Sequence, residues 1–376
     1  MSDTPNDPVR DLCRCLSFAP TQAATAALRQ RLAAGGWAAV LEAAKTRWLQ
    51  GALAEAVRAR GLVAGIPALT LPDGRVSISK GIADAEAHHL ELRRGKQERL
   101  AELVLILNGA GMEPILLKGA RSLWTGTPTW RAMGDLDLLV PGRAREAQQL
   151  ALAAGYAPDP SYDTHPEIWH HELNLYRADL PGWLEFHDRG AMYRADMLLP
   201  TPFLAAQSVA ITGPGGGVAR VLPAHIDLLY CMLHHHISHR GDKFGFMRVK
   251  GLYEFAGALA ALDAEGRAAL RALALSHPRI LAIFDLWMAA AHERFELPEI
   301  AELPLRDDAV AQWRVINGAE HIRGNYDGVA GEFRLGLSAA RLREATGGAT
   351  WLGRMRLRGR IIHSLFAPAI ERSRRE

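Results

Sequence analysis

Two aspartates separated by one residue constrain this sequence more than any other feature. Residues 135–140 read DLDLLV, a short apolar run that is typical of a buried strand. Side chains two residues apart on a strand point to the same face. Asp135 and Asp137 therefore emerge together, while Leu136 and Leu138 face a core on the other side. Two carboxylates this close repel each other unless a cation neutralises them, so the pair predicts a metal site.

The residues upstream add positive charge to the same region. Residues 113–117 predict another short strand, which ends at Lys118 and Gly119, and residues 120–124 predict the start of a helix. Gly119 permits a tight turn and a close approach of backbone. Lys118 and Arg131 are suited to phosphate groups. Acidic groups for a metal and basic groups for a polyphosphate together indicate metal-dependent nucleotidyl or phosphoryl transfer.

The pattern LLKGA, then Arg131, then GDLDLLV resembles an uncharacterised nucleotidyltransferase-like family of the DNA polymerase β superfamily. The resemblance covers residues 100–260. It implies an α+β fold with a small mixed sheet flanked by helices, an NTP as donor and Mg²⁺ as cofactor, with a two-metal site as one arrangement. Better-known members of that superfamily carry Gly-Gly or Gly-Ser where this chain has Lys118 and Gly119.

The resemblance also implies a third carboxylate on a strand beside the first pair, and Glu185 in the sequence LEFH is the candidate. The predicted catalytic and metal-binding residues are Asp135, Asp137 and Glu185. The predicted nucleotide-binding residues are Lys118, Gly119, Arg131, Gly134 and His187.

Each of these residues has a simpler interpretation that stays open. The aspartates could face solvent or cap a helix, and Glu185 could point outward from a hairpin. Lys118 or Arg131 could form a salt bridge to the aspartates. His187 could orient a phosphate or lie at the surface.

A histidine cluster near residue 235 permits three interpretations. His235 and His239 are four residues apart and share one face of a helix, which is the spacing of zinc ligands. No Glu, Cys or Asp completes an obvious ligand set, so packing in the core is favoured over a zinc site, and a place in the active cleft is the intermediate interpretation. Three further histidines, His165, His170 and His171, lie in or near a segment that could close over substrate.

The periodicity of the remaining chain predicts three regions: an N-terminal helical region over residues 1–83, a catalytic core over 84–222 and a C-terminal helical region over 223–376. A helix from residue 84 to about 108 carries the apolar positions Leu100, Leu103, Val104 and Leu107. A helix follows Pro141, and a hairpin joins strands at residues 172–176 and 183–187. A further strand covers residues 218–222. Helices are predicted at 225–238, 247–262, 264–276 and 278–293.

Composition adds exclusions. The formal charge is 44 − 41 = +3, so charge gives no strong indication of nucleic-acid binding. Three cysteines, the polar N-terminus and the lack of a long apolar run predict a reduced, cytoplasmic protein without a signal peptide or a membrane-spanning helix. The basic residues 351–366 predict a solvated terminal helix, with contact to a membrane surface as the weaker alternative.

The resulting hypothesis is a Mg²⁺-dependent, ATP- or other NTP-using nucleotidyltransferase with an unidentified hydroxyl-bearing acceptor. The alternative is a non-catalytic nucleotide-binding or scaffold protein of a polysaccharide or peptide-tailoring pathway.

Overall fold

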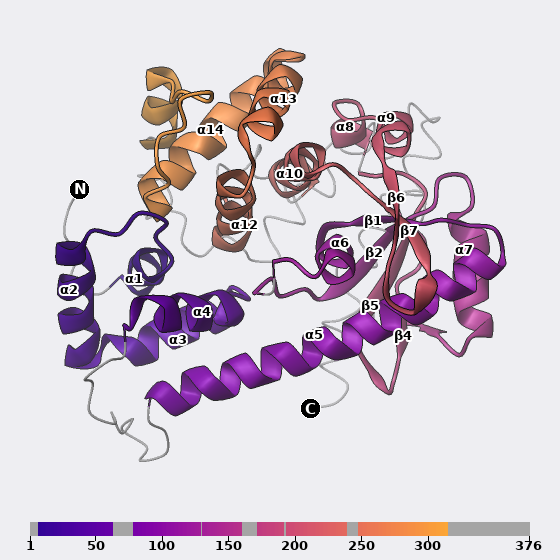
Figure 1. Cartoon of the computed structure of the whole chain (residues 1–376), viewed down its shortest axis with the longest axis horizontal. Helices are drawn as coiled ribbons and strands as arrows, with labels where there is room; N and C mark the ends of the chain where they lie inside the picture. The colour runs from indigo at the N-terminus through magenta and orange to yellow at the C-terminus, as the bar shows by residue number, and fades with distance from the viewer. Residues whose placement is uncertain are drawn as a thin grey trace, which may run out of the picture.

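The computed structural model describes residues 7–62, 78–128, 130–159, 171–191, 193–238 and 247–314. Within these ranges the fold is α+β, as predicted, with one seven-stranded mixed sheet and helices from both ends of the chain. Figure 1 shows the sheet on one side of the molecule and the terminal helices gathered on the other. The predicted helix over residues 351–366 lies outside the described residues.

The sheet is built around β2 (Asp135–Leu139). Its other strands are β1 (Ile115–Leu117), β3 (Ala157–Pro158), β4 (Leu175–Arg177), β5 (Leu180–His187), β6 (Val209–Thr212) and β7 (Val218–Val221), in the order β3-β4-β5-β2-β1-β7-β6. β2 is antiparallel to β1 and parallel to β5. The register places Asp137 opposite Leu117 on one side and opposite Glu185 on the other.

The two faces of the sheet belong to two different hydrophobic cores. Leu136 and Leu138 lie in one core with residues of α5 (Ile78–Gly109) and α7 (Ala144–Ala153). Leu117 and Leu139 lie in the other core with the terminal helices. The predicted alternation along β2 is confirmed, so the aspartates share the face that the second core covers.

This second core joins the two ends of the chain. The N-terminal helices are α1 (Pro8–Cys15), α2 (Gln22–Arg31), the π-helical turn η1 (Leu32–Gly36), α3 (Trp37–Thr46) and α4 (Gln50–Arg60). The C-terminal helices are α10 (Ala224–Leu233), the π-helical turn η3 (His234–Ser238), α12 (Val249–Ala260), α13 (Ala264–Leu275) and α14 (Pro278–Phe295). Phe18, after α1, donates a backbone hydrogen bond to Phe295 and its ring lies 5.5 Å from that of Tyr253. The division into three regions stays a prediction, but the two helical regions share one core.

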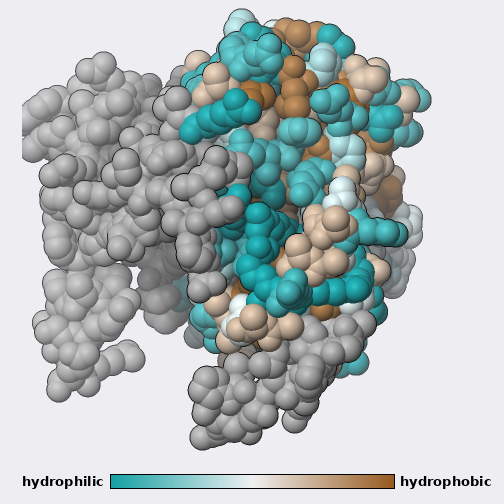
Figure 2. All heavy atoms as spheres, turned by 90° about the vertical axis from the view of Figure 1, so that its left-hand side faces the viewer, coloured by the Kyte–Doolittle hydropathy of each residue, from teal (hydrophilic) through white to brown (hydrophobic). Residues whose placement is uncertain are grey.

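The surface on the side of the N-terminal helices agrees with this arrangement. In the coloured part of the face seen in Figure 2, hydrophilic side chains predominate and hydrophobic ones form small separate areas. The leucines of α2 and η1, Leu28 and Leu32, are buried.

Helix α5 connects the helical part to the sheet. Its 32 residues span about 48 Å at 1.5 Å per residue, and Figure 1 shows it running from the N-terminal helices to beneath the strands. It begins six residues before the predicted position of 84 and ends at Gly109 as expected. The predicted apolar stripe is buried: Leu100, Leu103, Val104 and Leu107.

Three buried basic side chains of α5 anchor the segments around β2. Each donates to a backbone carbonyl: Arg93 to Ser122, Lys96 to Met133 and Arg99 to Gly182. Burial lowers the pKa of Lys96 to about 8. Basic residues on a helix are usually solvated, so the sequence interpretation assigned them no role.

Other elements differ from the prediction for local reasons. The hairpin of β4 and β5 is confirmed, although β4 covers Leu175–Arg177 and not residues 172–176, and β5 begins at Leu180. Helix α7 begins at Ala144, not directly after Pro141, because Gly142 has a left-handed φ of 73°. Strand β6 was missed because it is a largely exposed edge strand without an alternating apolar pattern. The strand β7 and the four predicted C-terminal helices are present.

The shorter helices lie around the sheet: α6 (Lys118–Thr125), α8 (Tyr193–Asp196), α9 (Thr201–Gln207) and the 3₁₀ turn η2 (Pro214–Gly216).

Asn108, in the last turn of α5, fastens this helix to β7. Its amide donates to the carbonyls of Met112 and Val218, and its oxygen accepts from the Val218 N–H.

Asn108→Asp should lower the free energy of unfolding by about 1–3 kcal/mol, because a carboxylate would face two carbonyl oxygens that now receive hydrogen bonds. Asn108→Ala should cost a similar amount. Urea unfolding of both variants measures the effect. If Asn108→Asp leaves the free energy of unfolding unchanged, only the hydrogen bond from the Val218 N–H contributes to stability.

Candidate functional site

The site begins where β1 passes into α6. Lys118 has a left-handed φ of 50°, a conformation that is uncommon for a residue with a side chain. A Cβ at Gly119 would lie 2.9 Å from both the Cβ and the Sδ of Met133. The predicted close approach at Gly119 is therefore present, whereas the left-handed backbone falls on Lys118.

Lys118 and Asp137 form a buried ion pair. The Lys118 Nζ lies 2.5 Å from Asp137 Oδ1, and Asp137 is 0% exposed. Burial raises the pKa of Asp137, but the Lys118 ammonium and His187 outweigh burial and hold it well below its usual range. Burial lowers the pKa of Lys118, but the Asp137 carboxylate raises it further, above its usual range. Of the salt bridges that the sequence left open, the one from Lys118 to Asp137 is present.

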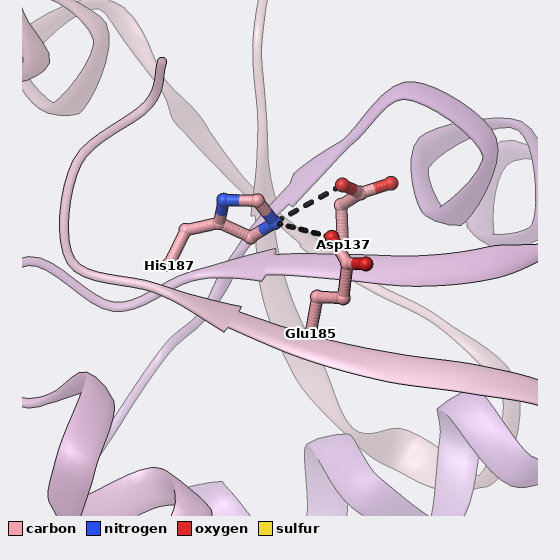
Figure 3. Close-up of side chains that lie close together, drawn as sticks. All are labelled: Asp137, Glu185 and His187. Atoms are coloured by element: carbon pink, nitrogen blue, oxygen red, sulfur yellow. Dashed lines mark hydrogen bonds and ion pairs between the residues drawn. The ribbon is translucent and has the colours of Figure 1, made fainter. Parts of the chain in front are cut away.

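Glu185 and His187 complete a compact group with Asp137. His187 Nε2 lies 3.0 Å from Asp137 Oδ1 and 3.5 Å from Glu185 Oε2 (Figure 3). One candidate ligand atom from each of the three residues lies within 4.8 Å of the other two. His187 is 0% exposed, so a surface position for it is wrong. The Asn174 amide donates to Glu185 Oε1 at 3.1 Å and orients that carboxylate.

The protonation of this group follows from its hydrogen bonds. Burial raises the pKa of Glu185, but the hydrogen bond to His187 and the charge of His171 lower it below its usual value. Burial lowers the pKa of His187, but the hydrogen bonds to Asp137 and Glu185 raise it above its usual value. Glu185 is therefore ionised at neutral pH and does not have the raised pKa of a general base.

Asp135 lies at the more exposed end of the same strand face. Its register partner on β5 is Trp183, which is 42% exposed. Within the described part of the chain, no hydrogen bond or ion pair holds the Asp135 carboxylate. The charge of Asp137, and then burial, raise the pKa of Asp135 to about 6. The repulsion that the sequence predicts between the two aspartates is therefore expressed in the raised pKa of Asp135.

Arg131 has a different partner from the one the sequence suggested. Its Nη2 lies 3.1 Å from Glu254 Oε2 of α12. His235 Nε2 lies 3.7 Å from the same oxygen, and Lys250 Nζ lies 3.6 Å from Glu254 Oε1. This buried network ties the loop before β2 to the C-terminal helices.

His235 packs closely against α12. A Cβ at Gly251 would lie 2.9 Å from His235 Cγ, so the absence of a side chain there permits the contact. This supports the packing interpretation of His235. His239, His165 and His170 lie outside the described residues.

Gly134 joins the loop to β2. Its carbonyl accepts a hydrogen bond from the Trp183 N–H at 3.1 Å, and a Cβ on it would lie 4.0 Å from the Trp48 ring. It therefore lies beside two partly exposed aromatic side chains at the end of the site where Asp135 is found.

Comparison with protein families matches residues 33–296 to the family described as "Uncharacterised nucleotidyltransferase". The matched range covers more than half of the chain and contains every residue of the site above. The chain belongs to this family. It is therefore a transferase, and its general activity is nucleotidyl transfer. No curated protein matches the chain.

In this nucleotidyltransferase, the match begins within the N-terminal helices and so extends beyond the region of resemblance that the sequence motifs indicated. None of the helices in the described ranges is both long and apolar enough to cross a membrane.

Sequence reasoning underestimated His187 and missed Asn174 and Lys96. The signal for His187 was available: Glu185 and His187 are two residues apart on one strand, which is the spacing of Asp135 and Asp137. No comparable signal exists for Asn174 or Lys96, because their partners are distant in the sequence.

Asp135→Asn should stabilise the metal-free protein at neutral pH and lose this advantage in acid. The folded-state pKa of about 6 lies above the value of about 3.9 in an unfolded chain. The contribution of this carboxyl to stability therefore falls as the pH rises from 4 to 7. We expect a gain of about 3 kcal/mol at pH 7.5 in EDTA and only about 1 kcal/mol at pH 4.5.

Chemical unfolding at both pH values measures this difference. The exposed Asp84, changed to Asn, is the control and should show no gain that depends on pH. An equal gain from Asp135→Asn at both pH values would show that relief of charge repulsion is not its cause.

Proposed function

We propose that this nucleotidyltransferase transfers an NMP group from an NTP to a hydroxyl-bearing acceptor with the help of a divalent cation. The observation that carries the proposal is the side-by-side placement of Asp137 and Glu185 on β2 and β5, with Lys118 at the adjoining end of β1. This arrangement combines oxygen ligands for a cation with a positive charge for phosphate.

The chemistry of the carboxylates fits a cation. Asp137 Oδ2 is buried and accepts no hydrogen bond from the described residues, although Oδ1 is shared by Lys118 and His187. A buried carboxylate oxygen without a partner is costly, and a cation would satisfy it. When bound, the cation would neutralise charge on the triphosphate and polarise the α-phosphoryl group. Mg²⁺ is the cation that the sequence predicts. The sequence also predicts Asp135 as a ligand, whereas in this proposal Asp135 does not bind the cation and serves as the base.

The side chains of the site would bind and orient the nucleotide. Lys118, which is 14% exposed at its side chain, would turn toward the β- and γ-phosphates. Arg131 would need to leave Glu254 to reach them, because Glu254 holds it in the nucleotide-free structure. Gly119 and Gly134 keep the adjoining backbone free of side chains, and Trp48 and Trp183 beside Gly134 offer apolar surface.

In the proposed reaction, the acceptor oxygen bonds to the α-phosphorus as the bond from that phosphorus to the bridging oxygen of the β-phosphate breaks. Pyrophosphate leaves with the electron pair of that bond. The proton of the acceptor hydroxyl passes to the Asp135 carboxylate, which has no fixed partner among the described residues. This requires Asp135 to face the acceptor at the more exposed end of the strand face.

The polymerase-β-like fold, the cytoplasmic location and a hydroxyl-bearing acceptor stay predictions. For the scaffold alternative, the supporting observation would be a missing third carboxylate. Glu185 lies beside Asp137, so that argument for a non-catalytic protein fails.

Glu185→Gln tests the proposal because it removes a charge and keeps the size of the side chain and a hydrogen-bonding group. The wild-type melting temperature should rise by several degrees with a divalent cation and an NTP together, since a ligand stabilises the state that binds it. The rise should be lost in Glu185→Gln and in Asp137→Asn. Thermal melts with EDTA, with the cation, and with the cation plus each NTP measure it.

The matched control is Asp285→Asn, which changes a buried aspartate of α14. It should keep the nucleotide-dependent rise. Transfer of label from an α-labelled NTP to a component of a cell extract is the test of activity. If no NTP shifts the wild-type protein, nucleotide binding is contradicted and the scaffold alternative takes its place.

A further inference from the structure

His187 places an imidazole nitrogen where the carboxylates of Asp137 and Glu185 meet. Figure 3 shows its Nε2 directed into the gap between the two carboxylates, with all three side chains on one face of β2 and β5. His187 Nε2 therefore points to the place where the proposed cation would bind. The inference that follows rests on the proposed function.

The distances between these atoms match those around a shared cation. Ligand atoms about 2.1 Å from one ion are separated by about 3.0 Å at right angles and about 3.4 Å at tetrahedral angles. His187 Nε2 lies 3.0 Å from Asp137 Oδ1 and 3.5 Å from Glu185 Oε2. These atoms therefore need little movement to become ligands of one ion.

The surroundings of the three residues are dry. Asp137 and His187 are 0% exposed and Glu185 is 9% exposed. Mg²⁺ gives up its water reluctantly, prefers oxygen ligands and usually keeps several waters. A buried site with an imidazole donor is thus poorly matched to Mg²⁺ and better matched to a first-row transition metal, to which imidazole binds well.

With the His187 imidazole neutral, as metal ligation requires, the charge of the group calls for a cation besides Lys118. Asp137 and Glu185 contribute two negative charges, and the Lys118 ammonium contacts only Asp137. Its contact is with Oδ1, which leaves Asp137 Oδ2 buried and without a hydrogen bond from the described residues. His171 lies near Glu185, at 4.0 Å from Oε2, too far for a hydrogen bond.

We propose that Asp137, Glu185 and His187 form a three-ligand site for a first-row transition-metal dication, which they bind in preference to Mg²⁺. Mn²⁺ is the probe, because it is a first-row dication that accepts carboxylate oxygens and its free form is measured by electron paramagnetic resonance. It lies at the weak end of the first-row series, so its retention against Mg²⁺ is a stringent test. His187 then acts as a metal ligand and not as a phosphate-orienting group.

Titration of the full-length, chelator-treated protein with MnCl₂ tests the preference without nucleotide. We expect one Mn²⁺ bound per chain, and a hundredfold excess of MgCl₂ should displace less than half of it. Displacement of Mn²⁺ by an equal concentration of Mg²⁺ would overturn the proposal, as would the absence of Mn²⁺ binding.

His187→Gln tests the ligand itself. The Gln amide can still donate to Asp137 or Glu185, so the group keeps a hydrogen bond, but its oxygen replaces the imidazole nitrogen. The affinity for Mn²⁺ should fall at least tenfold while that for Mg²⁺ changes less than threefold, so selectivity collapses. Equal loss for both metals would indicate a merely structural role and contradict the proposal.

The matched control is His234→Gln, which alters a buried histidine of η3 that stacks on Tyr230. It should leave the Mn²⁺ affinity within threefold of wild type. If circular dichroism shows that His187→Gln is unfolded, the competition between Mn²⁺ and Mg²⁺ for the wild-type protein still tests the proposed metal preference.

The result is distinguishable from failure of the proposed function. If Mn²⁺ binding depends on His187 but no nucleotide raises the melting temperature, the metal site is supported and nucleotide binding is contradicted. If Mg²⁺ and Mn²⁺ support the nucleotide-dependent rise in melting temperature equally, the proposed function is supported and the preference for a transition metal is contradicted.

Discussion

The buried charge of Asp137 is the constraint on which the rest of the structure depends. A carboxylate removed from water is unstable unless it is paired and hydrogen-bonded. Its partners are Lys118 at the end of β1 and His187 at the end of β5. β2 must therefore lie between these two strands, and the central order β5-β2-β1 of the sheet provides this.

The segments around this ion pair are held by buried polar contacts from other elements. Lys96 of α5 binds the loop before β2, and Arg99 binds the first residues of β5, both from one side of the sheet. Glu254 of α12 binds Arg131 from the other side. Partner loss in such contacts leaves a buried charge uncompensated, so they fix the site more firmly than apolar packing alone. The unusual backbone conformation of Lys118 is maintained within this framework.

The same framework explains how a nucleotidyltransferase can hold several carboxylates in a nearly dry environment. Asp137 and Glu185 are satisfied in part by Lys118, His187 and Asn174, whereas Asp135 is not. These partners hold the Asp137 and Glu185 carboxylates in place, where the proposed cation would bind. The helical regions add a core that is continuous from the N-terminal helices to the face of the sheet that carries the site.

Sequence alone determined the features that local periodicity encodes. The two-residue period of a strand placed Asp135 and Asp137 on one face and Leu136 and Leu138 on the other. Helical spacing located α5 and the C-terminal helices, and the alternation of apolar residues located the two strands of the hairpin that carries Glu185. These features depend on neighbouring residues, so the pattern was sufficient to predict them.

Only the tertiary structure decided which distant groups meet. It paired Lys118 with Asp137 and Arg131 with Glu254, buried His187 between two carboxylates, and directed basic residues of α5 into the protein. A short strand or a charged side chain has many possible partners at the level of sequence. The choice among them is made when strands are ordered and desolvation makes every unpaired charge costly, because both depend on the whole fold and not on local periodicity.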